Sequence, residues 1–484
     1  MTEMTSTSKP RGRLTGPEAV TGLGDLEILV QRLAAAPGAP SPSIGLCGVS
    51  IGTGSLAHLL ALAASLRRGE GNIAVLVDRR PMRGRDDQLL KSELSSSLAA
   101  VGEVRVVAIG DADGHVHADP ETLDLAVKGM GAAGLLVSVG SGTVTDIGKY
   151  TSRHLDGLPH IVVQTAASVN GFADDQSVLL VDGVKRTTPT RWPDWLIIDS
   201  DVISRAPAEM NRAGLGDLLA SYTAAADWRL AAFMRQDTSF SPTIVQLTSE
   251  YVDAVLDQAD AIGRGVPSAL DLLAAALAVS GIAMGVAGKT APGSGMEHTV
   301  SHLIEMTDAG ARALHGAQVG ILSVISACVW QLVREAARGG ALAKLRGPSA
   351  EEMERRVRDA FDAFDPSGAM AAECWNDYRR KLERHSEIGT TSAELVAHWR
   401  RLDADLEKTL AAPDRLADAL VRAGAPTRLS QLGIEPARAR WALESCHLMR
   451  DRFTVADLAF MLGLWDTDGV EHAIEMADNL GCGL

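Results

Sequence analysis

The chain changes its hydrophobic pattern near residue 200, and this change limits the folds that it can adopt. Before that point, short runs rich in Val, Ile and Leu alternate with segments of helical periodicity. The runs cover residues 43–49, 72–78, 103–109, 134–140 and 159–165. Continuous apolar runs separated by helices are typical of a parallel sheet that helices cover on both faces. Such a sheet binds ligands beyond the carboxyl ends of its strands.

After about residue 201, the strand-like runs give way to segments rich in Ala, Leu, Arg and Glu with helical periodicity. Loops are expected at residues 288–295 and 338–348. A chain of 484 residues is also too long for one compact core. We therefore predict a disordered N-terminus over residues 1–25, an α/β domain with a parallel Rossmann-like sheet over 26–200, and an all-helical domain over 201–484.

Composition and charge exclude several classes of partner. The net charge of -15 argues against nucleic acid or an anionic membrane surface, because both require clustered basic groups. The longest uncharged apolar stretch, residues 272–288, is shorter than the roughly 20 residues of a membrane span, so we expect a buried helix there. The first residues lack the apolar core of a secretory signal. The five cysteines are scattered without a CxxC pair, which indicates a reduced, cytoplasmic setting.

A glycine-rich turn follows the fourth apolar run, in the segment GLLVSVGSGTVTDIGKY. A strand that ends at Val139, the turn Gly140-Ser141-Gly142-Thr143 and a helix from about Val144 form a candidate pyrophosphate site. Glycines there let backbone N–H groups approach the phosphates at a helix N-terminus. Asp146 and Lys149 lie one helical turn further on, and they also fit an ordinary surface ion pair.

Asp78 ends the second apolar run, at a position where an acidic residue can accept hydrogen bonds from a ribose hydroxyl. A loop or helix-capping aspartate is an equally common explanation. The earlier glycine-rich turn at residues 52–55 is a weaker candidate for contact with the cofactor.

Three separate segments supply potential metal ligands. RAGLGDLLA places Asp217 near the start of a helix, SGMEHTVSHLIEM places His298 and His302 four residues apart on one helix face, and ALHGAQVG contains His315. Two neutral imidazoles and a carboxylate suit a divalent first-row metal with open positions for substrate. Spacing alone does not choose three of these four groups, and the ligand set leaves zinc, nickel and iron open.

These motifs occur together in a pattern that resembles the superfamily of dehydroquinate synthases, glycerol dehydrogenases and iron-type alcohol dehydrogenases. The nearest resemblance is to bacterial sn-glycerol-1-phosphate dehydrogenases of the arabinose-operon type. It runs from about residue 43 to the C-terminus and includes VGSGTVTDIGKY, QTAASVNGFADD, RAGLGDLLASYTAAADW, GSGMEHTVSHLIEM, LHGAQVGI and RDRFTVADLAFMLG. The resemblance implies a dehydroquinate synthase-like fold and a homodimer.

The resemblance also implies a role for each motif. The pyrophosphate loop would consist of Gly140, Ser141, Gly142, Thr143 and Val144, with residues 165–168, including Thr165 and Ser168, on the nicotinamide side of NAD(P)H. Asp217, His298 and His315 would bind the metal. His302 would face the substrate instead.

Two residues depart from the family pattern. Asn170 stands where the family usually has Asp, in contact with substrate, and Asp174 stands where it usually has a small hydroxyl residue, near the nicotinamide. Either the two changes compensate for each other, or the substrate differs from that of the family.

The expected reaction is the reduction of dihydroxyacetone phosphate to sn-glycerol 1-phosphate. The metal would polarise the carbonyl, NAD(P)H would supply hydride, and His302 and Asp217 would act at the reacting centre. Lys185 and Arg186 are candidates for a phosphate contact, although at least one of them is expected to be solvated surface charge.

The alternatives are a dehydrogenase of another polyol or ketone, a sugar-phosphate cyclase, and a pseudo-enzyme that senses ligand. The cyclase typically has Glu at the position of Asp217, which favours the dehydrogenase.

Overall fold

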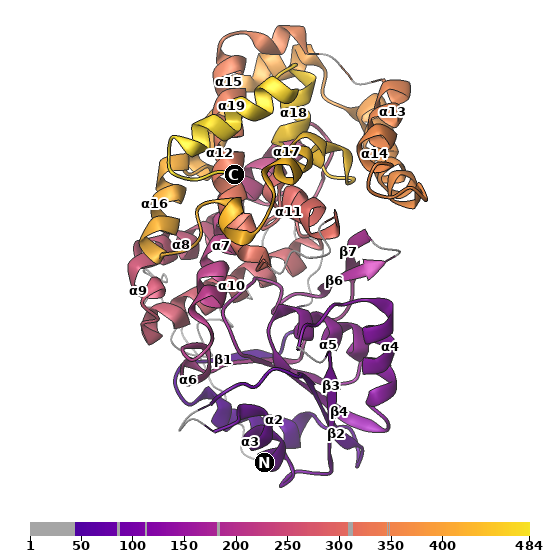
Figure 1. The fold of residues 1–484 in the computed structure, drawn as a ribbon, viewed down its shortest axis with the longest axis vertical. Helices are drawn as coiled ribbons and strands as arrows, with labels where there is room; N and C mark the ends of the chain where they lie inside the picture. The colour runs from indigo at the N-terminus through magenta and orange to yellow at the C-terminus, as the bar shows by residue number, and fades with distance from the viewer. Residues whose placement is uncertain are drawn as a thin grey trace, which may run out of the picture.

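The computed structural model describes residues 44–84, 88–111, 114–181, 184–307, 313–345, 347 and 349–484. The predicted disordered segment 1–25 lies outside these residues. In the view of Figure 1, a larger, helical part lies above an α/β part that contains the N-terminal strands.

A six-stranded parallel sheet forms the centre of the α/β part, in the order β1-β8-β5-β4-β2-β3. The strands are β1 (Gly48–Ile51), β2 (Asn72–Asp78), β3 (Val104–Ile109), β4 (Ala133–Gly140), β5 (His160–Gln164) and β8 (Trp195–Ile198). The predicted fold class, a parallel α/β sheet followed by a helical region, is confirmed. The prediction did not include β8, a strand of only four residues that pairs with both β1 and β5.

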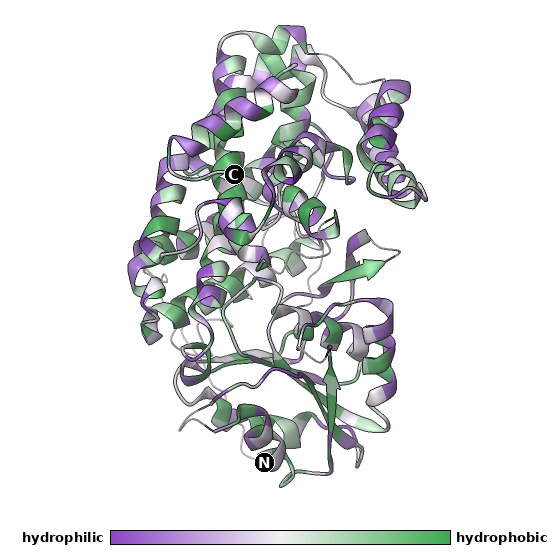
Figure 2. Ribbon diagram, viewed as in Figure 1, coloured by the Kyte–Doolittle hydropathy of each residue, from purple (hydrophilic) through white to green (hydrophobic). Residues whose placement is uncertain are grey.

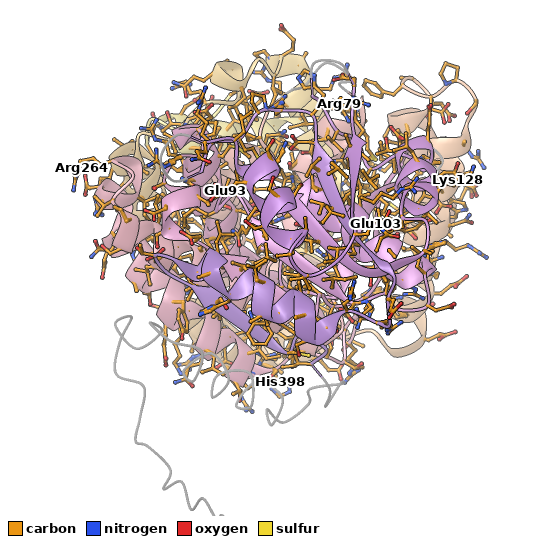
Figure 3. The ribbon with its side chains drawn as sticks, turned by 90° about the horizontal axis from the view of Figure 1, so that it is seen from below. Arg79, Glu93, Glu103, Lys128, Arg264 and His398 are labelled. Carbon is orange, nitrogen blue, oxygen red and sulfur yellow. The ribbon has the colours of Figure 1, made fainter. Side chains whose placement is uncertain are left out.

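Helices cover both faces of this sheet. Ile73, Val75 and Val77 pack toward α2 (His58–Leu66) and α3 (Leu90–Leu98). The alternate residues Ala74 and Leu76 pack toward α4 (Pro120–Gly129) and α5 (Gly142–His154). The period of two along the strand sends successive side chains to opposite faces. Figure 3 shows this end of the molecule, where labelled charged residues such as Glu93, Glu103 and Lys128 lie on the outside.

An antiparallel hairpin, which the sequence prediction also did not include, leaves the α/β part after β5. It consists of β6 (Gln176–Val181) and β7 (Val184–Pro189). In Figure 1 the hairpin lies between the sheet and the helical part. Ion pairs from Lys185 to Glu305 and from Arg186 to Asp377 attach β7 to the helical part.

The helical part begins directly after β8. Its long helices are α7 (Ala208–Phe233), α8 (Pro242–Asp257), α10 (Pro267–Ala287), α11 (Met296–Thr307), α12 (His315–Arg338), α13 (Ala350–Phe361), α14 (Ala369–Ile388), α15 (Ser392–Thr409), α16 (Pro413–Ala423), α17 (Pro436–Ser445) and α19 (Thr467–Asp478). The short helices are α6 (Ser200–Ile203), α9 (Ala259–Gly263) and α18 (Val455–Met461). Figure 2 shows that α13 and α14 are largely hydrophilic, as expected of peripheral helices.

Two of these helices, α10 and α12, are long and apolar enough to cross a membrane by length and composition. However, 89% of each apolar window is buried inside the protein. The expectation of a buried helix over residues 272–288 is met by α10, which forms part of the main core.

Glycines bring α7 and α12 into direct backbone contact. A Cβ atom on Gly216 would lie 2.2 Å from the carbonyl oxygen of Gly316, and one on Gly320 would lie 2.8 Å from the Cα of Gly216. No larger residue fits there without moving one helix. The residues next to these glycines are Asp217 on α7 and His315 on α12, so the contact sets the distance between two of the predicted ligands.

Candidate metal and nucleotide site

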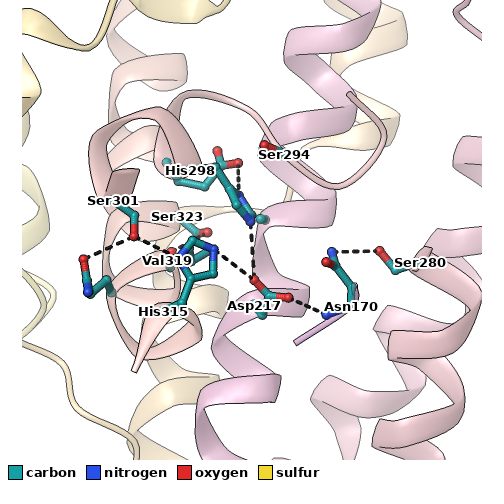
Figure 4. A network of polar contacts seen from close by, with 12 residues as sticks. Asn170, Asp217, Ser280, Ser294, His298, Ser301, His315, Val319 and Ser323 are labelled. Carbon is teal, nitrogen blue, oxygen red and sulfur yellow. Dashed lines mark hydrogen bonds and ion pairs between the residues drawn. The ribbon is translucent and has the colours of Figure 1, made fainter. Parts of the chain in front are cut away.

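Three of the predicted ligands meet between α7, α11 and α12 (Figure 4). Asp217 Oδ1 lies 3.4 Å from His298 Nε2 and 4.0 Å from His315 Nε2. Asp217 is only 1% exposed, and its Oδ1 accepts no hydrogen bond. Asp217 lies in the middle of α7, so the prediction that it lies near a helix start was wrong. The helix extends nine residues before it, back to Ala208.

This arrangement fits a metal ion. Donors about 3.3 Å apart are expected around a tetrahedral ion with bonds near 2 Å, and an unsatisfied buried carboxylate oxygen is costly unless a cation neutralises it. Burial opposes protonation of His298, but its contacts with the carboxylates of Asp217 and Glu297 raise its pKa to about 9. A proton on His298 Nε2 therefore supplies positive charge next to Asp217, and a bound metal ion would replace that proton.

Each of the two histidines contacts a second carboxylate through its other ring nitrogen. His298 Nδ1 lies 3.2 Å from Glu297 Oε1, and His315 Nδ1 lies 3.2 Å from Glu305 Oε1. Such outer carboxylates fix the ring orientation and direct Nε2 toward the metal. Sequence analysis missed both glutamates. Their positions in the sequence could have indicated this role, because Glu297 is next to His298 and Glu305 lies two helical turns further along α11.

The other oxygen of Asp217 is held by the segment that leaves β5. The backbone N–H of Asn170 donates to Asp217 Oδ2 at 2.9 Å, and the Asn170 side chain donates to Ser280 Oγ at 3.3 Å (Figure 4). Asn170 therefore orients the carboxylate through its backbone, while its side chain lines the cavity beside it.

His302 lies next to this cluster, on the same helix as His298. Its ring stacks on that of His315 with centroids 5.3 Å apart, and its buried Nδ1 has no hydrogen-bond partner. Burial, followed by the charge of Arg450, lowers the pKa of His302 well below its usual range. An alternative cluster of His302, Glu305 and His315 also has donor atoms close enough for a metal. Glu305, however, is already neutralised by Lys185, which lies 2.8 Å away.

A cavity of about 200 Å³ opens in front of the cluster, between the two parts of the molecule. His298, His302 and His315 form its wall on the helical side. On the sheet side, the predicted site residues that line it are Gly142, Thr143, Asp146, Asn170, Asp174 and Lys185. Residues from the predicted pyrophosphate loop and from the metal cluster thus face the same space.

The predicted pyrophosphate loop joins β4 to α5. Gly140 ends the strand, Ser141 is the N-cap residue of α5 without a side-chain capping bond, and the helix begins at Gly142. Added Cβ atoms at Gly140 and Gly142 would lie 2.6 Å from Val144 and 2.7 Å from Val169. The glycines are therefore required by close packing as well as by the approach of a ligand.

Lys149 is fully buried, so the expected pair with Asp146 is formed but does not lie on the surface. Its Nζ lies 2.6 Å from Asp174 and 3.1 Å from Asp146, and it also donates to the carbonyl of Gly171. Two carboxylates share one ammonium group. Burial has the larger effect on Asp174 and raises its pKa to about 7, although the positive charge of Lys149 lowers it.

Six predicted cofactor contacts do not line the cavity, namely Gly140, Ser141 and Val144 of the loop, together with Thr165, Ser168 and Asp78. Thr165 and Ser168 are buried beside it, and the N–H of Thr165 donates to the carbonyl of Gly140 at 3.1 Å. Asp78 ends β2, where its Oδ1 lies 2.6 Å from Lys91 Nζ and accepts from the N–H of Arg80. These contacts are those of a loop aspartate, the alternative explanation for this residue.

The chain is similar to proteins of known family. A family model for iron-containing alcohol dehydrogenases matches residues 50–207. An NAD(P)+-dependent glycerol-1-phosphate dehydrogenase from Geobacillus stearothermophilus is 29% identical over 356 residues, which cover 71% of this chain and 76% of the relative. A protein with the same name from Methanothrix thermoacetophila is 32% identical over 269 residues, or 55% of this chain and 71% of the relative.

Solved structures share the fold. A probable glycerol dehydrogenase from Sinorhizobium meliloti 1021 matches with a TM-score of 0.54 at 17% identity, over 89% of this chain and 97% of that one. Glycerol dehydrogenase from Schizosaccharomyces pombe matches with a TM-score of 0.53 at 16% identity, over 89% of this chain and 91% of that one. At this identity the likeness concerns the fold alone.

Proposed function

We propose that this chain, which belongs to the iron-containing alcohol dehydrogenase family, is an NAD(P)H-dependent, metal-dependent reductase that converts dihydroxyacetone phosphate to sn-glycerol 1-phosphate. The observation that carries the proposal is the buried, unsatisfied Oδ1 of Asp217, which faces Nε2 of His298 and of His315. The choice of substrate is supported by the relatives named glycerol-1-phosphate dehydrogenase.

Asp217, His298 and His315 would hold one divalent ion. When bound, the ion would act as a Lewis acid on the substrate carbonyl, and the nicotinamide would supply the hydride. Zinc, nickel and iron all remain compatible with a site of two imidazoles and one carboxylate. The rest of the chemistry falls to side chains around the cavity.

His302 is placed to contact the substrate. It lies within the cavity wall beside His315, its Nδ1 is unpaired, and Glu305 already pairs with His315 and Lys185. We propose that His302 orients a substrate hydroxyl group and helps to move a proton to the reduced oxygen. Asn170, by holding Asp217 Oδ2, keeps Oδ1 directed at the metal position.

We propose that Gly140, Ser141, Gly142, Thr143 and Val144 receive the pyrophosphate of NAD(P)H at the N-terminus of α5. Thr143 and Asp146 face the cavity from that helix. Thr165, Ser168 and Asp174 would lie on the nicotinamide side, and Asp78 near the ribose. The partnership of Asp174 with Lys149 means that Asp174 does not add a free charge to the cavity.

The two departures from the family pattern do not contact each other. Asn170 bonds to Ser280, whereas Asp174 bonds to Lys149. The charge lost at Asn170 is therefore not replaced beside the metal site, and a different keto-polyol phosphate is the outcome to test against dihydroxyacetone phosphate.

The test is an NAD(P)H oxidation assay with dihydroxyacetone phosphate, dihydroxyacetone and related keto-polyol phosphates, after metal removal and addition of zinc, nickel or iron. We expect metal-dependent consumption of NAD(P)H with dihydroxyacetone phosphate as the best substrate. If the enzyme turns over only another ketone, the assignment of dihydroxyacetone phosphate as substrate is refuted. Substrate consumption without net oxidation of NAD(P)H would indicate a cyclase instead.

The setting of the enzyme is part of the proposal. All five cysteines are unpaired, as expected in the cytoplasm, and we propose a homodimer that binds neither nucleic acid nor membranes.

A further inference from the structure

A second and larger cavity, of about 480 Å³, adjoins the cavity at the metal cluster. The two share four lining residues, namely Gln176, Thr187, Thr290 and Ser294. The far wall of the second cavity comes from the end of α7, the loop after α10 and the segment Arg450–Phe453. This last segment belongs to none of the predicted site motifs, although it opens the RDRFTVADLAFMLG stretch.

Five cationic side chains line the second cavity, and most are already paired. Arg235 pairs with Glu394, Lys289 with Asp237, and Arg384 with Asp451. The remaining two are Arg450 and Arg452, which form no ion pair with a carboxylate among the residues that the structure describes.

Arg450 contacts Lys185, a residue that lines the metal cavity. Its Nη2 donates to the backbone carbonyl of Lys185 at 3.1 Å, and its Nε is buried without a partner. Among the neighbouring charges, that of Arg450 lowers the pKa of His302 the most. Burial, followed by the charge of Arg452, lowers the pKa of Arg450. An anion placed here would satisfy a guanidinium group that the protein leaves unneutralised.

Arg452 has a different role. It donates to Ser294 Oγ at 2.7 Å, to Thr290 Oγ1 at 2.5 Å and to the carbonyl of Ser294. Thr290 and Ser294 lie in the wall that both cavities share. Arg452 therefore holds the loop between the two cavities and adds positive charge to the space.

Lys185, the predicted phosphate contact, is less suitable than Arg450. Its ammonium group lies 2.8 Å from Glu305, which itself contacts a metal-site histidine. Phosphate binding by Lys185 would leave Glu305 without its cation, whereas phosphate binding by Arg450 breaks no ion pair.

We propose that Arg450, in a loop positioned by Arg452, binds the phosphate group of the substrate, with its carbonyl end at the Asp217–His298–His315 site. This inference rests on the proposed function, because it assigns one end of that substrate. Arg450 would then select phosphorylated ketones over their unphosphorylated analogues. The phosphate could belong to the substrate or to the nicotinamide cofactor. The kinetic test distinguishes them, because it measures KM for each separately.

The test compares the wild type with Arg450→Gln, Arg450→Lys and a control, Arg384→Gln, in the metal-loaded protein. We expect Arg450→Gln to raise KM for dihydroxyacetone phosphate by about 10- to 100-fold, the loss expected for charge-assisted hydrogen bonds. KM for NAD(P)H and turnover of dihydroxyacetone should stay within about twofold. Arg450→Lys should recover part of the loss. Arg384→Gln removes a cation from the same cavity but one that is paired, so we expect a change of less than about threefold.

An unchanged KM for dihydroxyacetone phosphate in Arg450→Gln would overturn the inference while leaving the proposed function intact. A rise in KM for NAD(P)H alone would assign Arg450 to the cofactor and overturn it too, as would an equal loss in Arg384→Gln. Binding of inorganic phosphate, measured by calorimetry, tests the subsite even if the wild type fails to reduce dihydroxyacetone phosphate. Phosphate should bind the wild type and bind Arg450→Gln at least tenfold more weakly, and equal binding would refute the subsite.

Discussion

At the scale of single residues, the metal site depends on groups that do not themselves face the metal position. Glu297 is fully buried, contacts His298 Nδ1, and also accepts from Thr223 Oγ1 at 2.8 Å and from the N–H of Gly295 at 2.6 Å. It is thus held by three contacts. Its role is to position His298, which it contacts directly.

Replacing Glu297 by Gln should weaken metal binding about 10- to 100-fold, because the ring of His298 loses the carboxylate that directs Nε2. The measurement is the dissociation constant for zinc or nickel, determined by competition with a chelator. Glu250→Gln, on the exposed surface of α8, is the matched control. Equal metal affinity in Glu297→Gln and in the control would show that Glu297 does not position the ligand.

The buried group of Asp174, Lys149 and Asp146 predicts a pH effect on stability. Burial raises the pKa of Asp174 to about 7 from a usual value near 4. A carboxyl group whose pKa is higher in the folded protein binds more protons there, so its contribution to stability declines as pH rises from about 4 to 7.

Asp174→Asn removes this decline. Relative to the wild type, the free energy of unfolding of the variant should therefore increase by about 1 kcal/mol or more between pH 5 and pH 8. Urea unfolding of both proteins at the two pH values measures the difference. A difference between variant and wild type that does not change with pH would refute this explanation.

Residue types alone identified candidates but could not select among them. The sequence offered Asp217, His298, His302 and His315, and only the family resemblance separated His302 from the others. The structure groups the same three residues because the glycine contact between α7 and α12 places Asp217 opposite His315. Arg450 could not have been placed, since it lies 265 residues from the Lys185 carbonyl that it contacts.

At the scale of secondary structure, the distance between α7 and α12 controls the site. Gly216→Ala would place a methyl group 2.2 Å from the carbonyl oxygen of Gly316 and force the helices apart. We expect a loss of about 1–3 kcal/mol in the free energy of unfolding, as for other overpacked positions, and weaker metal binding. Gly347→Ala, where an added Cβ has no neighbour within 4 Å, is the control. Unchanged denaturant unfolding and metal affinity in Gly216→Ala would contradict the role of this contact.

The elements of the α/β part were predictable to different degrees. Long apolar runs such as residues 72–78 were placed correctly as strands, because β2 is buried on both faces and its pattern is continuous. The strand β8 was missed because four residues give little periodicity. The hairpin β6–β7 was missed because its polar second strand, KRTTP, lies over a cavity and not in the core.

At the scale of the whole molecule, the site lies where the two parts meet. The sheet contributes α5 and the segment after β5, whereas the helical part contributes Asp217 and all three histidines. The parallel sheet predicts a ligand site at the carboxyl ends of its strands, and the cavity contains Gly142 and Thr143 from just after β4. What the sequence could not reveal is that the helical part completes this cavity, since no local pattern reports the docking of two parts of a chain.

The central claim is that His298, and not its neighbour His302, holds the metal that activity requires. The direct measurement is the metal content of His298→Ala and His302→Ala after reconstitution, together with their NAD(P)H oxidation rates on dihydroxyacetone phosphate. We predict that His298→Ala loses both metal and activity, whereas His302→Ala keeps about one metal per chain and loses activity. Retention of stoichiometric metal by His298→Ala, or its loss from His302→Ala, would contradict the site.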